Sequence, residues 1–271
     1  MAMDQLKLNK KGEDEMSFLE HLEALRWHIL RAFAAIVLAA IGVFLAKDFV
    51  FQTVIFGPKE ADFVTYRFIC GFSDFLCFEP TPLRIETRDL AEQFIVHLKS
   101  SFWIGLILAF PYVFWEFWRF VKPGLHEREQ KVTRGVVLVC SLLFALGVCF
   151  GYFIISPFAI SFLSSYDVGA NNAPTLASYV SYMTMFTIPA GLVFELPIVV
   201  YFLATLGVVG PKDMRKYRRH AVIVILILAS IITPPDMITQ LLIGIPLFIL
   251  YEISIIIASK VEKRRKAAKD D

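Results

Sequence analysis

The stretch Met183–Leu206 reads MTMFTIPAGLVFELPIVVYFLATL, and its 24 residues carry a single formal charge, Glu195. Its length and composition predict a membrane-spanning helix, which needs about 20 apolar residues. A carboxylate at bilayer depth costs at least about 2.5 kcal/mol on insertion scales, so it usually faces a bundle interior, a wet cavity or a partner. Pro189 and Pro197 each remove a backbone donor, so we expect this helix to bend around Glu195.

The rest of the chain is equally apolar, since 57% of its residues are hydrophobic and its mean hydropathy is +0.62. The apolar residues are gathered in runs, which is typical of a polytopic membrane protein. We expect an all-α, concave bundle of transmembrane helices, several of them kinked by proline, in a single membrane domain over residues 1–271. The six predicted spans are about 29–50, 101–121, 135–163, 183–206, 220–232 and 237–259, with a long external loop at about 52–97.

The last two runs have two interpretations, one long broken span or two short spans joined by Thr233-Pro234-Pro235-Asp236. The positions of Lys and Arg separate them. Residues 207–219 contain five of these cations and residues 260–271 contain six, whereas 233–236 contain none. Basic segments stay on the cytoplasmic side, so an even number of crossings joins the two. The sequence therefore predicts six spans, with the N-terminus and the C-terminus both in the cytoplasm.

Several classes of function are disfavoured by what the sequence lacks. A net charge of +2 does not indicate the strongly basic surface that a nucleic-acid-binding protein needs. The sequence contains no HExxH, GxSxG, GxxxxGK[ST] or CxxC motif, and its five histidines are scattered. We therefore predict that the protein is not an enzyme and has no catalytic residues, metal site or cofactor.

The four cysteines fall into two pairs with different expected roles. Cys140 and Cys149 lie within the third predicted span, where cysteine usually acts as a small packing residue. Cys70 and Cys77 lie in the external loop, a compartment that permits a disulfide. Loop geometry does not follow from spacing, so a disulfide between Cys70 and Cys77 stays open at this point.

A lone intramembrane acid also fits a different class, a proton-coupled small-solute transporter in which Glu195 carries the proton. Many such transporters are built from internal repeats. The two halves of this chain do not correspond, because the first holds a long external loop and the second a compressed hairpin. We keep this class as the alternative. Gly147 and Gly151 form a GxxxG spacing, for which we favour close helix packing over dimerisation.

Two segments on the predicted cytoplasmic side carry acids of interest. Ser17-Phe18-Leu19-Glu20 has the pattern of a capping box and predicts the start of an amphipathic helix, which an ordinary interfacial helix would also show. The loop after the second span contains Glu127 and Glu129 among basic residues. These acids either balance the neighbouring bases or bind a cationic peptide through charge-assisted hydrogen bonds.

Four segments together resemble one family, the Sec-independent, twin-arginine protein translocase subunit TatC. They are His21-Leu22-Glu23-Ala24-Leu25-Arg26 before the first span, Phe120-Val121-Lys122-Pro123-Gly124-Leu125 with Glu129 after the second, Phe194-Glu195-Leu196-Pro197 in the fourth, and Thr233-Pro234-Pro235-Asp236 with Gln240 at the last hairpin. The segments occur in order over nearly the whole chain. The match is strong because each lies at the expected place in the six-span pattern.

The resemblance implies a receptor that binds the twin-arginine signal peptides of folded proteins at the cytoplasmic face. It also implies single-span TatA-like and TatB-like partners, an oligomeric complex, transport driven by the protonmotive force, and a bacterial cytoplasmic (inner) membrane. Contact with membrane lipid is expected at the basic tail, where Lys263-Arg264-Arg265-Lys266 suits an anionic surface.

The resemblance further implies two acids that meet the two arginines. One acid falls on Glu129, but the position of the other is Ala24 in this sequence. Glu23 or Glu20 is therefore expected to replace it, although a shift of one residue rotates a side chain by about 100° on a helix. A site with two carboxylates should prefer arginine to lysine, because a guanidinium presents a planar fork to a carboxylate.

These expectations define two groups of residues. The expected peptide site consists of Glu129, Glu20, Glu23, Phe120, Leu25 and Arg26, with Phe120 as its apolar wall. Glu195 and Gln240 are expected to be intramembrane polar contacts for a partner helix or for the inserted signal.

Overall fold

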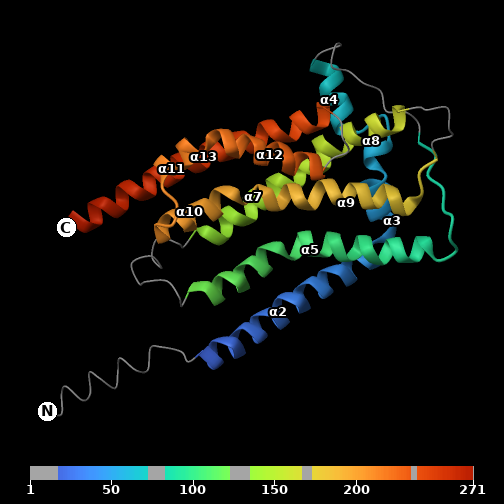
Figure 1. The fold of residues 1–271 in the computed structure, drawn as a ribbon. Helices are drawn as coiled ribbons and strands as arrows, with labels where there is room; N and C mark the ends of the chain where they lie inside the picture. The colour runs from blue at the N-terminus through green and yellow to red at the C-terminus, as the bar shows by residue number, and fades with distance from the viewer. Residues whose placement is uncertain (1–17, 73–82, 123–134, 167–172, 233–236, 271) are drawn as a thin grey trace.

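The computed structural model describes residues 18–72, 83–122, 135–166, 173–232 and 237–270, and within these ranges the chain is helical apart from short connections and one isolated bridge. Figure 1 gives the arrangement of the helices. In chain order the elements are α2 (Phe18–Leu45), α3 (Lys47–Phe49), η1 (Val50–Ile55), η2 (Gly57–Lys59), α4 (Val64–Phe72), α5 (Glu92–Val121), α7 (Val136–Phe150), η4 (Gly151–Ile155), α8 (Ser156–Ser165), α9 (Leu176–Val193), α10 (Leu196–Leu206), α11 (Pro211–Lys216), α12 (Arg218–Ile232) and α13 (Met237–Asp270). The prediction of an all-α membrane protein is confirmed.

Five helical stretches in the described ranges are long and apolar enough to cross a membrane: Leu22–Leu45, Glu92–Val121, Val136–Ser165, Leu176–Leu206 and Gln240–Arg264. The predicted fifth span corresponds to α12, which has only 15 residues. At 1.5 Å per residue α12 is about 22 Å long, shorter than a hydrocarbon core of about 30 Å. The count of six spans stays a prediction, which requires α12 to tilt little or the bilayer to thin around it.

The helices α2 and α5 run side by side, and α2 continues without a break from the amphipathic segment into the first span (Figure 1). Their contact is close at Gly105, where an added Cβ would lie 2.6 Å from the backbone N of Ala40. The first turn of α2 and the last turn of α13 lie at the same end of the bundle (Figure 1). This arrangement agrees with termini on one side of the membrane.

The contact between α7 and α9 depends on glycine in the same way. A Cβ at Gly147 would lie 2.7 Å from the carbonyl oxygen of Ala190, and one at Gly151 would lie 2.7 Å from that of Phe186. On α9, a Cβ at Gly191 would lie 2.8 Å from the ring of Phe144. The GxxxG spacing therefore serves close packing within the chain, as the sequence analysis favours.

The predicted bend in the fourth span lies at Glu195. The helix α9 ends at Val193, and α10 begins at Leu196 after a turn through Phe194 and Glu195. The N–H groups of Ile198 and Val199 both donate to the carbonyl oxygen of Glu195, at 3.0 and 3.1 Å. Because Pro197 has no N–H to offer, the helix restarts on these two donors. The expectation of a helix interrupted around the acid is confirmed.

The helix α5 begins at Glu92, well before the predicted start of the second span at 101. Its first turn is fixed by the Glu92 carboxylate, which accepts hydrogen bonds from the N–H groups of Arg88 at 2.7 Å and of Ala177 at 2.8 Å. A carboxylate beside a helix N-terminus also interacts favourably with the helix dipole. Residues 92–100 belong mostly to the predicted external loop, yet they form about two and a half turns of helix. Part of the reason lies far away in the sequence, because the start of this helix is held by the hydrogen bond from Ala177.

The first part of the external loop is tied to the bundle by tyrosine hydroxyls. Tyr152 donates to the Val54 carbonyl at 2.7 Å, and Tyr179 donates to the Ile55 carbonyl at 2.9 Å. Within the loop itself, Tyr66 donates to the Pro58 carbonyl at 2.9 Å. These bonds satisfy the carbonyls where the chain leaves α3 and turns back toward the membrane.

The cysteines differ in their environments. Cys70 of α4 is disulfide-bonded, while Cys77 lies outside the described residues. Cys140 is a free, buried cysteine, whereas Cys149 is free and exposed, in the lining of a cavity that also includes Trp103. The expectation of a packing role holds for Cys140 and is wrong for Cys149, because the side chain of Cys149 is not enclosed by its neighbours.

Candidate functional site

The N-terminal part of α2 and the C-terminal part of α5 meet around Phe120. The ring of Phe120 stands edge-on to the imidazole of His28, with 6.2 Å between the ring centroids. His28 is four residues after Ala24, so both lie on one face of α2. Phe120 therefore lies beside the helix that carries the segment His21–Arg26.

The other expected site residues of α2 point in several directions. Leu25 is half-buried, whereas Glu23 and Arg26 are exposed. The Arg26 guanidinium lies 5.9 Å from the ring centroid of Trp27. The side chain of Glu20 lies outside the part of the chain whose side chains are described, and Glu129 lies outside the described residues altogether.

Helix geometry separates Glu20 from Glu23 as replacements for the acid missing at Ala24. The face of α2 that carries His28 is turned toward α5, because His28 contacts Glu116 and Phe120 there. At about 100° per residue, Glu23 lies about 140° around the helix from His28, and Glu20 about 80°. Glu23 is therefore on the side of α2 away from α5.

The most buried acid at this end of α5 is Glu116, which the sequence patterns did not single out. Its side chain is 1% exposed, and its Oε2 lies 2.5 Å from Nδ1 of His28. The hydroxyl of Tyr112 donates to Oε1 at 3.0 Å. The available signal was the same one that marks Glu195, an acid inside an apolar run.

Glu116 also has a cation beside it. Nη1 of Arg119 lies 3.8 Å from Oε1 of Glu116, and the Arg119 guanidinium lies 4.8 Å from the ring centroid of Trp115. One arginine thus lies next to a carboxylate and over an aromatic face, the two surfaces that a guanidinium prefers. Arg119 is half-exposed, so this edge of the cluster is open.

Glu195 lies at the break between α9 and α10, against α7. The buried thiol of Cys140 and the backbone N–H of Phe144, both on α7, are polar groups that interact with its carboxylate. Both carboxylate oxygens are buried, and no hydrogen bond of normal geometry reaches them from the described parts of the chain. A buried polar group without a hydrogen-bond partner is costly, so the Glu195 carboxylate is a destabilising feature of this part of the fold.

Gln240 lies on a different pair of helices. Its side-chain amide donates to the carbonyl of Leu226 at 3.1 Å and so joins α13 to α12. This contact is exposed on the outside of the bundle. The structure therefore places Gln240 and Glu195 against different neighbours, although both were expected to contact a partner within the membrane.

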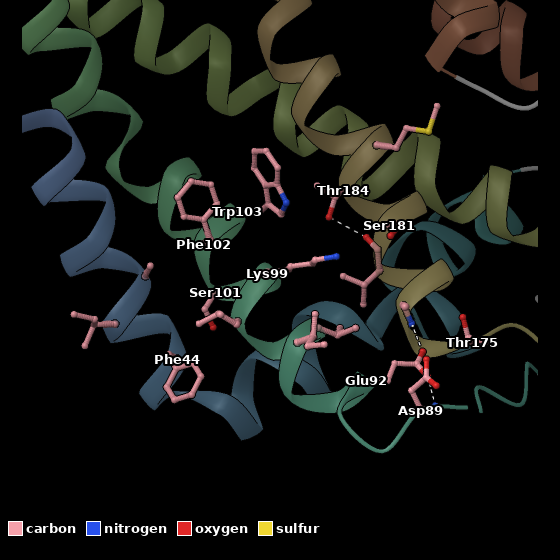
Figure 2. A pocket seen from close by; sticks show the side chains of 18 of the residues that line it. Phe44, Asp89, Glu92, Lys99, Ser101, Phe102, Trp103, Thr175, Ser181 and Thr184 are labelled. Carbon is pink, nitrogen blue, oxygen red and sulfur yellow. Dashed lines mark hydrogen bonds between the residues drawn. The ribbon is translucent and has the colours of Figure 1, made fainter. Parts of the chain in front are cut away.

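A groove of about 1220 Å³ lies between α2, α5 and α9. Figure 2 shows the Lys99 side chain extending from α5 toward α9, where Ser181 and Thr184 lie. Phe102 and Trp103 belong to the same wall. The groove is at the opposite end of α5 from Phe120, about 25 Å away along the helix, so it is separate from the expected peptide site.

Residues 20–246 match the family model described as Sec-independent protein translocase protein (TatC). The chain belongs to the TatC family. It is therefore a component of the twin-arginine translocase and a multi-pass membrane protein of a protein transport pathway. The resemblance inferred from four short segments is confirmed by a match over most of the chain.

Curated TatC proteins from distant bacteria are similar over almost their full length. The TatC of Blattabacterium sp. subsp. Periplaneta americana (strain BPLAN) is 38% identical over 266 residues, which cover 94% of this chain and 100% of that protein. TatCy of Bacillus subtilis (strain 168) is 33% identical, with 99% of this chain and 98% of that protein covered.

Solved TatC structures share the fold. A crystal structure of the twin-arginine translocase receptor TatC superposes with a TM-score of 0.69 at 28% identity and covers 90% of this chain and 100% of that chain. A second crystal structure of the receptor, in DDM, gives a TM-score of 0.70 at 29% identity, with 88% and 99% covered. The helical arrangement described above is therefore that of the TatC family.

Proposed function

We propose that this TatC family member is the receptor subunit of its translocase and binds the twin-arginine signal peptides of folded proteins at its cytoplasmic face. Glu129 is the first acid for the peptide's arginines, and Phe120 is the apolar wall beside them. Leu25 and Arg26 of α2 complete the site, with Glu20 ahead of Glu23 as the α2 acid.

The observation that carries this proposal is the contact between His28 and Phe120, 6.2 Å between ring centroids. It joins the segment His21–Arg26 to the end of α5, two parts of the chain about 90 residues apart in sequence. The loop with Glu129 follows α5 directly, so both acidic segments begin at this end of the bundle. Bidentate pairing with carboxylates explains why the peptide should carry arginine and not lysine.

The proposal extends to the partners within the membrane. Single-span TatA-like and TatB-like proteins assemble with this chain, and export of the folded cargo is driven by the protonmotive force. Glu195 supports such an assembly, because its buried carboxylate oxygens have no hydrogen-bond partner in the described ranges. Gln240, half-buried on α13 and in an exposed hydrogen bond to Leu226, offers a second polar contact. A polar group on a single-span partner would satisfy either residue.

Site-specific photo-crosslinking tests the peptide site. A photoreactive residue is placed in turn at positions 20, 23, 120 and 129, and each protein is exposed to a peptide with Arg-Arg and to one with Lys-Lys. We expect crosslinks with the Arg-Arg peptide from 129, 120 and 20, and weaker ones from 23. Equal yields with both peptides would remove the recognition function.

A charge reversal gives the complementary test. Glu129→Lys should abolish crosslinking of the Arg-Arg peptide from position 120 while the protein still inserts into the membrane. The same crosslinking yield in Glu129→Lys and in the unaltered chain would contradict the assignment of Glu129. A proton-coupled small-solute transporter, the alternative class, would not distinguish the two peptides in either experiment.

A further inference from the structure

Glu116 occupies the place where this chain needs another acid. We propose that Glu116 is a further carboxylate of the signal-peptide site, beside Glu129 and the α2 acid, and that an arginine of the peptide binds it in place of His28. The inference rests on the proposed function and deepens it, because it adds an acid on α5 near Ala24, where the resemblance expects one. It assigns to α5 a role that the resemblance places on α2.

The position of Glu116 relative to Ala24 supports this assignment. On α2, Ala24 and His28 are one turn apart on the face turned to α5; on α5, Glu116 and Phe120 are likewise one turn apart on the face turned to α2. His28 contacts both Glu116 and Phe120, so it links the two turns of α5 that carry these residues. Measured along the helix axes, Glu116 is therefore about one helical turn, about 6 Å, from Ala24.

A guanidinium already lies beside this carboxylate. Nη1 of Arg119 is 3.8 Å from Oε1 of Glu116, and the same guanidinium lies over the Trp115 ring. The 3.8 Å separation is too long for a hydrogen bond, so Oε1 retains capacity for a closer arginine. An arginine from the peptide would find an acid and an aromatic surface that suit its planar group.

Exchange of His28 for an arginine is also electrostatically reasonable. A histidine donates one hydrogen bond to Glu116 from Nδ1, whereas a guanidinium is always charged and has five donors in a rigid fork. Tyr112 keeps its hydrogen bond to Oε1 during the exchange. The His28 side chain is 17% exposed, whereas that of Glu116 is 1% exposed, so the exchange requires the imidazole to turn outward, which a side-chain rotation allows without breaking the helix.

The first experiment removes the charge of Glu116 and then introduces a carboxylate at position 24, where the resemblance expects an acid. Binding of fluorescent Arg-Arg and Lys-Lys peptides is measured on the purified full-length protein in detergent. Glu116→Gln should weaken Arg-Arg binding about ten- to a hundredfold, the effect of one charge-assisted hydrogen bond. Adding Ala24→Glu to this variant should restore most of the loss. Glu252→Gln is the matched control, because Glu252 forms an ion pair of 2.7 Å with Arg218 elsewhere, and it should bind as the unaltered chain does.

A second variant distinguishes a role of Glu116 in peptide binding from a purely structural role in holding α2 against α5. His28→Arg strengthens the ion pair with Glu116, so a purely structural contact would be preserved or improved. The proposal instead expects Arg-Arg binding to fall at least about tenfold, because the new arginine occupies Glu116 permanently. This variant keeps the test valid even where Glu116→Gln does not fold.

The outcomes are distinct. Unaltered binding in Glu116→Gln or in His28→Arg would overturn the inference while leaving the receptor function intact. Failure of Ala24→Glu to restore binding in a folded Glu116→Gln protein would also overturn it. If the unaltered chain does not prefer Arg-Arg to Lys-Lys, the proposed function itself fails.

Discussion

The carboxylate of Glu92 accepts a hydrogen bond from the backbone N–H of Ala177 at 2.8 Å. Glu92 is in the first turn of α5 and Ala177 is in the first turn of α9, so this bond joins the starts of two spans that are far apart in sequence. The second oxygen accepts from Arg88 at 2.7 Å. One side chain thus holds the end of the external loop against the bundle.

The bonds of Glu92 predict an effect on stability. Glu92→Ala leaves the N–H groups of Ala177 and Arg88 without their acceptor, so we expect a fall of several degrees in the melting temperature of the detergent-solubilised protein. The neighbouring Gln93 is exposed, and Gln93→Ala is the control that should melt as the unaltered chain does. Equal melting of Glu92→Ala and Gln93→Ala would contradict the anchoring role.

Two glycine positions predict opposite effects of alanine. At Gly147 an added Cβ would lie 2.7 Å from the backbone oxygen of Ala190, and such overpacking should cost about 1–3 kcal/mol of unfolding free energy. At Gly42 an added Cβ meets nothing within 4 Å. Gly42→Ala should therefore be neutral or stabilise helix α2 by up to about 1 kcal/mol. Chemical denaturation of the two variants measures both effects, and a stable Gly147→Ala protein would show that α7 and α9 separate easily.

Tyr66 predicts a dependence of stability on alkaline pH. Burial raises the pKa of Tyr66 to about 12, above the ordinary value of about 10 that applies to the unfolded chain. The folded state therefore favours the neutral hydroxyl, and this contribution is complete below pH 10 and lost as the pH rises through 12. Tyr66→Phe removes the bond to Pro58 and should cost about 1 kcal/mol at neutral pH.

The pH profile distinguishes this effect from a general loss of packing. The difference in unfolding free energy between the unaltered chain and Tyr66→Phe should shrink between pH 10 and pH 12. Tyr166 is exposed, so Tyr166→Phe should follow the unaltered chain at every pH. A constant difference over this range would show that the hydroxyl of Tyr66 is not in the neutral, donating state assigned to it.

The Glu195→Gln variant should lose transport without losing stability. Glu195→Gln removes a buried charge whose oxygens lack a hydrogen-bond partner in the described residues, so the variant should melt no lower than the unaltered chain. Export of a folded reporter with a twin-arginine signal peptide should fall, because the partner's contact is weakened. Full export by a correctly folded Glu195→Gln protein would favour a purely structural scaffold at this position.

Much of the fold could be predicted from particular patterns in the sequence. The run around Glu195 indicates a span interrupted by proline, because Pro189 and Pro197 remove donors that no neighbouring residue can replace locally. The GxxxG at Gly147 and Gly151 indicates close packing against another helix, and the structure identifies that helix as α9. The start of α5 was harder to predict, since one of the hydrogen bonds that hold Glu92 there comes from Ala177 of α9, which is distant in sequence.

The same distinction between local patterns and long-range contacts applies to the candidate site. The sequence by itself determined the membrane class, the order of the spans and the family, because apolar runs, prolines and short motifs act over a few residues and need no partner. Only the tertiary structure decided that Glu116 faces His28, that Glu23 is turned away from α5 and that Gln240 is joined to α12. Each of these depends on which face one helix presents to another, and that choice is made by packing between segments distant in sequence.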